Sequence, residues 1–163
     1  MKRLFNKRMA ETFLQRAANK FCESNAGWNH KSLLMSMIPN IQVHVTNKLK
    51  SSWGQVRLTD STDVEVLPYY IHSMGHMYIH IDLNRRLMQW AKPQDGFDTV
   101  AHELAHCLDY VIRGTTYHDE HWRELALAMG CDGNAFSDIE VPKYVCETKI
   151  LEPTMRKGYN DSY

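Results

Sequence analysis

Apolar side chains recur every three to four positions near the start of the chain, a spacing typical of amphipathic helices. A first helix is predicted over residues 10–23, with a break at Gly27. Its buried side would be formed by Phe13, Ala17 and Phe21. A second, shorter helix is predicted over residues 33–37, and it stops before Pro39.

Alternation of apolar and polar residues follows and predicts short strands, each with one buried face. The apolar positions are Ile41, Val43 and Val45, then Val56 and Leu58, then Val64 and Val66, and finally Ile79, Ile81 and Leu83. His44 and His80 fall on the polar faces of two of these strands, where we expect solvated side chains rather than metal ligands. A small sheet of three or four strands is therefore expected.

A helix with two different sides is predicted after the strands. One side is an apolar stripe at helical spacing, formed by Phe97, Ala101, Leu104, Leu108 and Val111. With about 100° of rotation per residue, His102 and His106 fall on the opposite side, and Glu103 lies on the flank between them. The core-facing side and the side that carries reactive groups are thus separate.

The residues from His102 to His106 read His-Glu-Leu-Ala-His, which is the layout of a metal-dependent hydrolase. Two imidazoles four residues apart lie about one turn apart on one helix face, so both can direct lone pairs at one Zn²⁺. Glu103 stands beside the open coordination position. With nine histidines and nine glutamates in 163 residues, chance alone would produce roughly 0.03 such patterns.

A hydrolytic zinc site usually takes three protein ligands and keeps a fourth position for water, so one ligand must come from elsewhere. A metzincin would need glycine and histidine where this chain has Asp109 and Ile112, and an aspzincin would need aspartate where it has His118. The candidates that remain are His118, His121 and a carboxylate from the next helix, Glu120 or Glu124.

That next helix is predicted to begin near Thr116, which forms a capping-box-like pattern with Asp119, and to end near Gly130. His118 would lie in its opening turn, where a loop of about eleven residues can fold back to the metal. Its apolar face, expected to pack on the preceding helix, consists of Trp122, Leu125, Ala126 and Met129.

These residues resemble the SprT-like family of zinc metalloproteases, which includes the Spartan protease. The family pattern is HExxH, a loop, and a histidine followed four residues later by an aromatic residue, which His118 and Trp122 match. Asp119 stands where many members carry glycine. Residues 50–54 are similar to the Trp-Gly strand of the family, and residues 81–84 are similar to its strand before the active-site helix. The resemblance covers roughly residues 10 to 131.

The resemblance implies one catalytic Zn²⁺ held by His102, His106 and His118, with Glu103 as general base. The order of helices, sheet and two metal-site helices predicts an α+β class, and the resemblance implies a minimal zincin-like domain. We assign this domain to residues 1–131 and a partly irregular C-terminal extension to residues 132–163. In such a fold, an edge strand beside the metal can pair with an extended substrate.

Three functions are compatible with these residues. The first is an endoprotease whose polypeptide substrates include proteins attached to DNA, as in DNA–protein crosslink repair. The second is a hydrolase that uses the same metal on a non-peptide substrate such as a nucleotide phosphate. The third is a binding module stabilised by a structural zinc, which would have no need of Glu103 as a base.

Charge is distributed unevenly although the net charge is zero. Residues 1–58 hold ten Lys or Arg and two acids, a balance of +8, and residues 59–163 hold nine and seventeen, a balance of −8. Non-specific DNA binding is therefore a candidate property of the basic N-terminal third. Its basic face would be formed by Lys2, Arg3, Lys7, Arg8, Arg16 and Lys20.

The remaining composition favours one intracellular, cytoplasmic domain. The chain is long enough for one core, and it has neither a membrane-spanning apolar run nor the pattern of a secretion signal. Its cysteines are scattered without a C-x-x-C pair, so the C-terminal zinc ribbon of many SprT-like proteins is not expected and the thiols should be reduced. They are Cys22, Cys107, Cys131 and Cys146.

Overall fold

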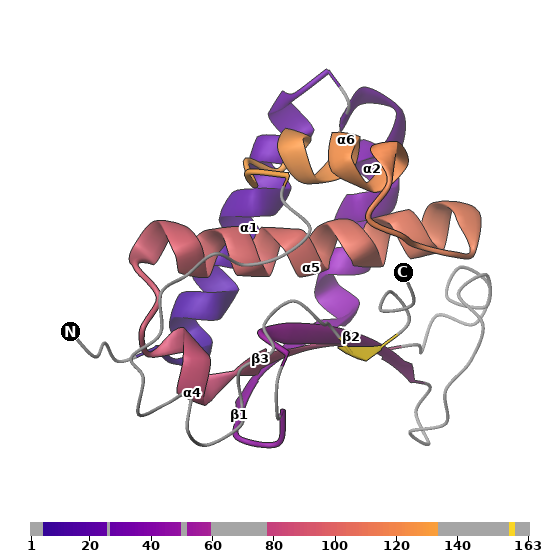
Figure 1. Ribbon diagram of the computed structural model, residues 1–163. Helices are drawn as coiled ribbons and strands as arrows, with labels where there is room; N and C mark the ends of the chain where they lie inside the picture. Colours follow the sequence, from indigo (N-terminus) through magenta and orange to yellow (C-terminus); the bar gives the residue numbers. More distant parts are fainter. Residues whose placement is uncertain (1–4, 26, 50–51, 60–77, 134–156, 159–163) are drawn as a thin grey trace.

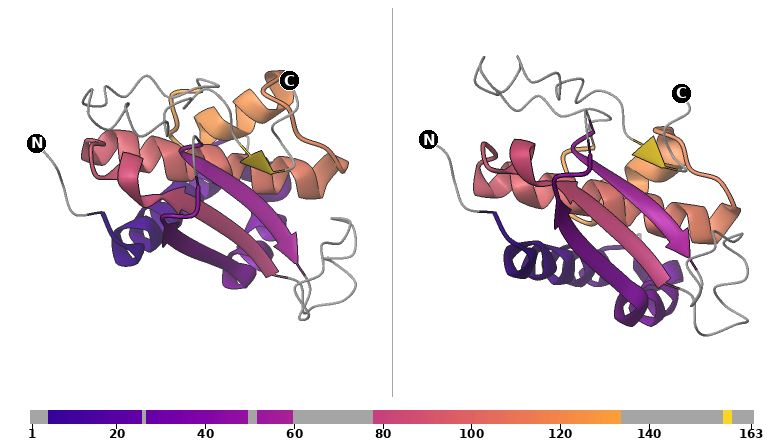
Figure 2. Two further views of the ribbon diagram at one scale, coloured as in Figure 1. Left: turned by 60° about the horizontal axis from the view of Figure 1, so that its bottom comes forward. Right: turned by 90° about the horizontal axis from the view of Figure 1, so that it is seen from below.

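The computed structural model of the chain describes residues 5–25, 27–49, 52–59, 78–133 and 157–158. Helices cover one face of a mixed sheet, so the predicted α+β class is confirmed (Figures 1 and 2).

The N-terminal pair of helices forms where the apolar spacing predicts it. Helix α1 spans Lys7–Glu23 and helix α2 spans Gly27–Met37, followed by a 3₁₀ turn at Ile38–Asn40. The side chain of Asn6 caps α1 by accepting a hydrogen bond from the backbone N–H of Met9, 2.9 Å away. This cap lets α1 begin three residues before the first apolar position of the predicted helix.

Three strands of the sheet belong to the predicted set. They are β1 (Ile41–Thr46), β2 (Gly54–Thr59) and β3 (Tyr78–Asn84), and β3 lies between the other two, parallel to β1 and antiparallel to β2. A fourth, two-residue strand, β4 (Lys157–Gly158), pairs in parallel with Gln55 and Val56 of β2. The strand predicted through Val64 and Val66 lies outside the described residues.

The sheet has an apolar inner face and a polar outer face, because side chains alternate along each strand. Ile79, Ile81 and Leu83 are completely buried against the helices. On the outer face, His80 lies within hydrogen-bonding distance of His44, with 2.9 Å between Nδ1 and Nε2. The prediction of a solvated His80 is wrong, since its side chain is almost fully buried in this polar cluster.

An ion pair fixes the same outer face beside the two histidines. Arg57 and Gln55 of β2 donate hydrogen bonds to the carboxylate of Asp82 on β3, at 2.6 and 2.7 Å. Burial raises the pKa of Asp82, but these hydrogen bonds outweigh burial and hold the pKa below its usual value. This cross-strand contact stabilises the antiparallel pairing of β2 with β3.

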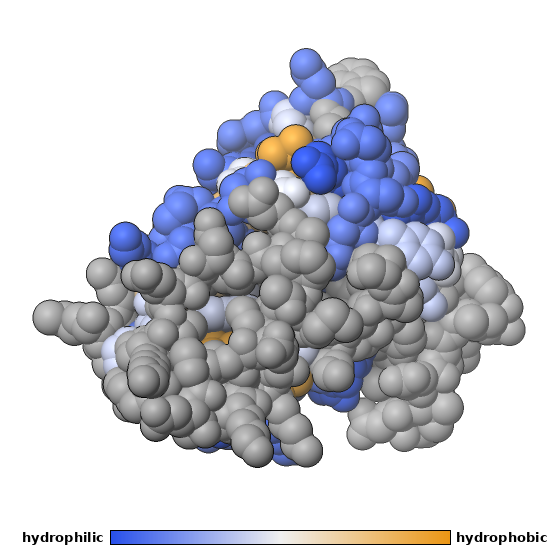
Figure 3. All heavy atoms as spheres, in the orientation of Figure 1, coloured by the Kyte–Doolittle hydropathy of each residue, from blue (hydrophilic) through white to orange (hydrophobic). Residues whose placement is uncertain are grey.

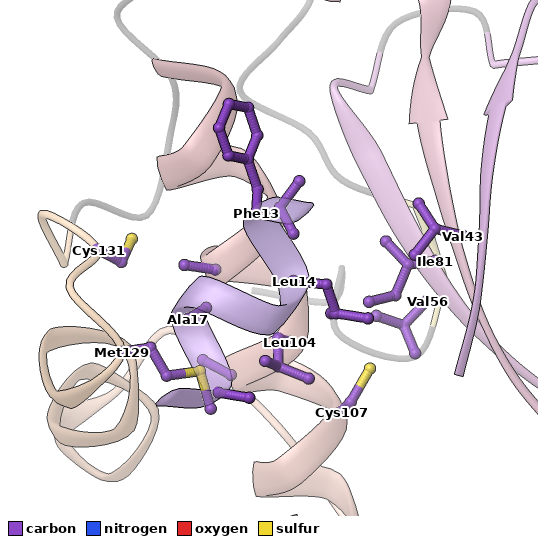
Figure 4. Close-up of a cluster of buried hydrophobic side chains, with 14 of the residues drawn as sticks. Phe13, Leu14, Ala17, Val43, Val56, Ile81, Leu104, Cys107, Met129 and Cys131 are labelled. Atoms are coloured by element: carbon purple, nitrogen blue, oxygen red, sulfur yellow. The ribbon is translucent and has the colours of Figure 1, made fainter. Parts of the chain in front are cut away.

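The C-terminal helices pack against this sheet and against α1. A short helix, α4 (Arg85–Met88), connects β3 to the long helix α5 (Pro93–Arg113), and α6 (Glu120–Ala128) follows. Helices α1 and α5 contact each other along their apolar sides and both face the sheet. Figure 4 shows the resulting core, in which side chains of α1, α5 and the strands meet, among them Leu14, Leu104, Val43, Val56 and Ile81.

Candidate metal centre

Three histidine side chains converge at one point between α5 and the loop that precedes α6. The Nε2 atom of His106 lies 3.2 Å from that of His102 and 3.0 Å from that of His118. The Nε2 atoms of His102 and His118 are 3.1 Å apart. Among the residues that the structure describes, this triad is the group of side chains that could hold a metal ion.

The backbone brings the third histidine to the other two. His102 and His106 lie one turn apart on α5, as their spacing predicts. Helix α5 ends at Arg113 and is capped by Gly114, whose φ of +76° is in the left-handed region that favours glycine, and the chain then turns back along the helix. His118 follows in this loop, directly before the N-terminal cap of α6.

That cap is Asp119, whose carboxylate accepts a hydrogen bond from the backbone N–H of Trp122 at 3.2 Å. Thr116 has no part in the cap, so the predicted pairing of Thr116 with Asp119 is wrong. The hydroxyl of Thr116 is instead buried against α5. Helix α6 therefore begins after His118, which lies in the loop rather than in its first turn.

The ring of Trp122 packs against all three histidine rings of the triad. Its ring stacks on that of His106, with centroids 5.1 Å apart and planes 20° apart, and it meets the rings of His102 and His118 edge-on. Its indole N–H also donates to the backbone carbonyl of His102 at 3.4 Å. The aromatic residue four positions after His118 thus fixes the orientation of all three imidazoles.

The donor set suits zinc. Tetrahedral Zn²⁺ binds imidazole nitrogen at about 2.0–2.1 Å, which places the ligand atoms about 3.3 Å from one another. The separations of 3.0 to 3.2 Å between the Nε2 atoms are close to this value. Three neutral imidazoles with a position left open for water form a known catalytic zinc set.

Glu103 lies next to the triad and is completely buried. Its carboxylate reaches the first residue of β2, where a Cβ atom added to Gly54 would lie 3.0 Å from Oε1 and 3.1 Å from Cγ of Glu103. Any side chain at position 54 would push against this carboxylate. Gly54 therefore provides the space in which Glu103 sits.

The position of Gly54 is itself fixed by the end of β3. The side-chain amide of Asn84 donates to the carbonyls of Leu49 and Ser52, at 3.3 and 3.0 Å, and its backbone N–H donates to Trp53. The carboxamide oxygen of Asn84 also caps α4. One buried side chain thus holds the segment that leads into β2 beside Glu103.

The comparisons with known proteins show the family of the chain. The model of the SprT-like family matches residues 10–144, which is most of the chain. The chain belongs to the SprT-like family. No curated protein and no solved structure matches it.

The other candidate ligands of this SprT-like domain lie away from the triad. The ring of His121 contacts the carboxylate of Asp109 through Nδ1. Glu120 is paired with Arg123 on the surface, and Glu124 is exposed. Of the histidines and acids considered, the structure therefore groups His118 with the HExxH pair.

Cysteine thiols do not contribute to this centre in the described part of the chain. Burial raises the pKa of the Cys107 thiol well above its ordinary value, and the nearby charge of Glu103 raises it further. Figure 4 shows Cys107 within the apolar cluster. Cys22, Cys107 and Cys131 are free cysteines, and Cys146 lies outside the described residues.

Sequence reasoning missed three residues of the site in this SprT-like domain. The Trp-Gly segment includes Gly54, but the proximity of Gly54 to Glu103 does not follow from the sequence pattern. Asp109 and Thr116 bond to each other beside His106. A signal for Asp109 was present, because it follows His102 and His106 at seven and three residues and so shares their side of the helix.

We expect Gly54→Ala to lower the free energy of unfolding by about 1–3 kcal/mol, because the new methyl group overpacks against Glu103. In a Glu103→Ala background most of this loss should disappear, since the facing side chain is gone. Urea denaturation of the wild type, both single variants and the double variant measures the coupling. Equal losses in both backgrounds would contradict the contact.

Proposed function

We propose that this SprT-like domain is a zinc-dependent endoprotease in which Glu103 is the general base. The observation that carries this proposal is the convergence of three Nε2 atoms beside a buried glutamate. His102, His106 and His118 would hold the ion. A bound zinc ion supplies a Lewis acid that polarises a carbonyl group and makes water more acidic.

Glu103 then performs the proton transfers of hydrolysis. Its carboxylate accepts a proton from the attacking water and returns it to the amine of the leaving fragment. The absence of a side chain at Gly54 leaves room for this carboxylate beside the first residue of β2.

The position of strand β2 favours a polypeptide as the substrate. It borders Glu103 at Gly54, so an extended peptide paired along β2 would present its carbonyl groups to the site. Strand β4 pairs with Gln55 and Val56 of this strand. A substrate that uses the same edge would replace the pairing with Lys157 and Gly158.

The binding-module alternative is less well supported. Structural zinc sites are closed by four protein ligands, whereas the described residues bring three together. A buried glutamate beside an open position suits hydrolysis. The phosphate-hydrolase alternative uses the same groups and is separated by substrate alone, which a parallel assay with nucleotide phosphates decides.

We expect Glu103→Gln to keep the bound metal and to lower casein hydrolysis by at least about a hundredfold, because glutamine keeps the shape but removes the base. Glu124→Gln is the matched control, since Glu124 is exposed on α6. Activity of the wild type should vanish with a chelator and return with zinc. Near-normal hydrolysis by zinc-loaded Glu103→Gln would contradict the assigned role.

We further propose that the substrates include proteins on DNA, held near the site by basic residues of α1. Lys7, Arg8, Arg16 and Lys20 are exposed, while Lys2 and Arg3 lie outside the described residues. The charges of Arg16 and Lys20 lie over the ring of Phe97, 5.6 and 5.8 Å from its centroid. Figure 3 shows a largely hydrophilic surface over the helical half of the view it presents.

Within the described residues, every helix is too short or too polar to traverse a bilayer.

This surface should bind oligonucleotides without sequence preference, and the affinity should fall steeply with salt as counterions are released. Replacing Lys7, Arg8, Arg16 and Lys20 by glutamate should abolish binding and leave casein hydrolysis intact. A fluorescence titration with single- and double-stranded DNA measures this. Absence of wild-type binding at about 100 mM salt would contradict the DNA-directed part and leave the protease proposal standing.

A further inference from the structure

A buried chain of hydrogen bonds runs from His106 into the loop that carries His118. The Nδ1 atom of His106 lies 2.8 Å from Oγ1 of Thr116, and this hydroxyl donates to Oδ2 of Asp109 at 2.6 Å. All three side chains are almost fully buried. These hydrogen bonds thus connect the ring of His106 to the carboxylate of Asp109, three residues farther along α5.

Arg113 continues this chain toward α6. Its guanidinium donates two hydrogen bonds to Asp109, at 2.7 and 2.8 Å, and two to Asp119, at 2.9 and 2.7 Å. Hydrogen bonds to Asp119 and Asp109 raise the pKa of Arg113 above its usual range, and the same contact lowers that of Asp119. Arg113 therefore ties the end of α5 to the cap of α6, on either side of His118.

The directions of these hydrogen bonds follow from counting protons. Asp109 faces the guanidinium of Arg113, so its carboxylate accepts, and the single proton of the Thr116 hydroxyl goes to Asp109. The oxygen of Thr116 is then left as an acceptor for His106. The Nδ1 atom of His106 must carry the proton, and its Nε2 atom directs a lone pair at the centre of the triad.

We propose that Thr116, oriented by Asp109, is a positioning residue that sets the tautomer of His106 and thereby the affinity for zinc. This inference rests on the proposed zinc site. It assigns to Thr116 a function for which the sequence offered only helix capping. It also explains why Asp109, a charged residue, is completely buried on the metal-facing side of α5.

Two substitutions of Thr116 test the proposal through zinc affinity, measured by competition with a fluorescent chelator. Thr116→Val keeps the shape of the side chain but removes the hydroxyl, and it should weaken zinc binding about 10- to 100-fold. Thr116→Ser restores the hydroxyl and should restore an affinity within about threefold of the wild type. Urea denaturation of the metal-free proteins establishes that both variants are folded.

Wild-type affinity in Thr116→Val, or equal weakening in Thr116→Val and Thr116→Ser, would overturn the positioning role. A His102→Ala, His106→Ala double variant separates this from the zinc site itself. Loss of zinc in the double variant together with unchanged binding in Thr116→Val would refute only the role of Thr116. Full binding in the double variant would refute both the site and its positioning residue.

Discussion

The structure depends on bringing three imidazoles from two separate segments to one point, where two of them are almost fully buried. His102 and His106 are 2% and 1% exposed, and Glu103 beside them is fully buried. Polar groups in such surroundings cost free energy unless they have partners. Ring nitrogens that face one another at 3.0 to 3.2 Å form an arrangement that one shared cation would stabilise.

The other elements of the fold pack around this site and hold its residues in place. The apolar side of α5 packs against α1 and the sheet, which turns its histidines toward α6. Trp122 closes the site from α6, and Gly54 allows β2 to approach Glu103. The Asp109–Arg113–Asp119 network then fixes the loop between the two helices. Each of these contacts comes from a different part of the chain, so loss of one packing contact should disturb the geometry of the whole centre.

Much of this arrangement follows from local rules. Helical spacing predicts both α5 with its two sides and α6 with Trp122 in its buried face, and alternation predicts the three main strands. The contacts across the chain do not follow from spacing. Thr116 satisfies a local capping pattern, yet tertiary packing directs its hydroxyl to Asp109. His80 lies on a polar strand face, but a neighbouring histidine and an ion pair bury it there.

The third candidate ligand shows where local reasoning reaches its limit. His118 and His121 are three residues apart, and spacing alone leaves both as candidates. The choice depends on where α6 begins, which is set by the cap at Asp119 and by the contact of His121 with Asp109. The family resemblance favours His118, because it includes the position of Trp122.

The most direct test of the account is X-ray absorption at the zinc edge of the purified protein. Three imidazole nitrogens and one further light atom at about 2.0–2.1 Å are predicted, and His118→Ala should lose one imidazole from this shell. His30→Ala, on α2, should leave the spectrum unchanged. A sulfur shell at about 2.3 Å, or an unaltered spectrum in His118→Ala, would contradict the central claim that these three histidines hold the metal.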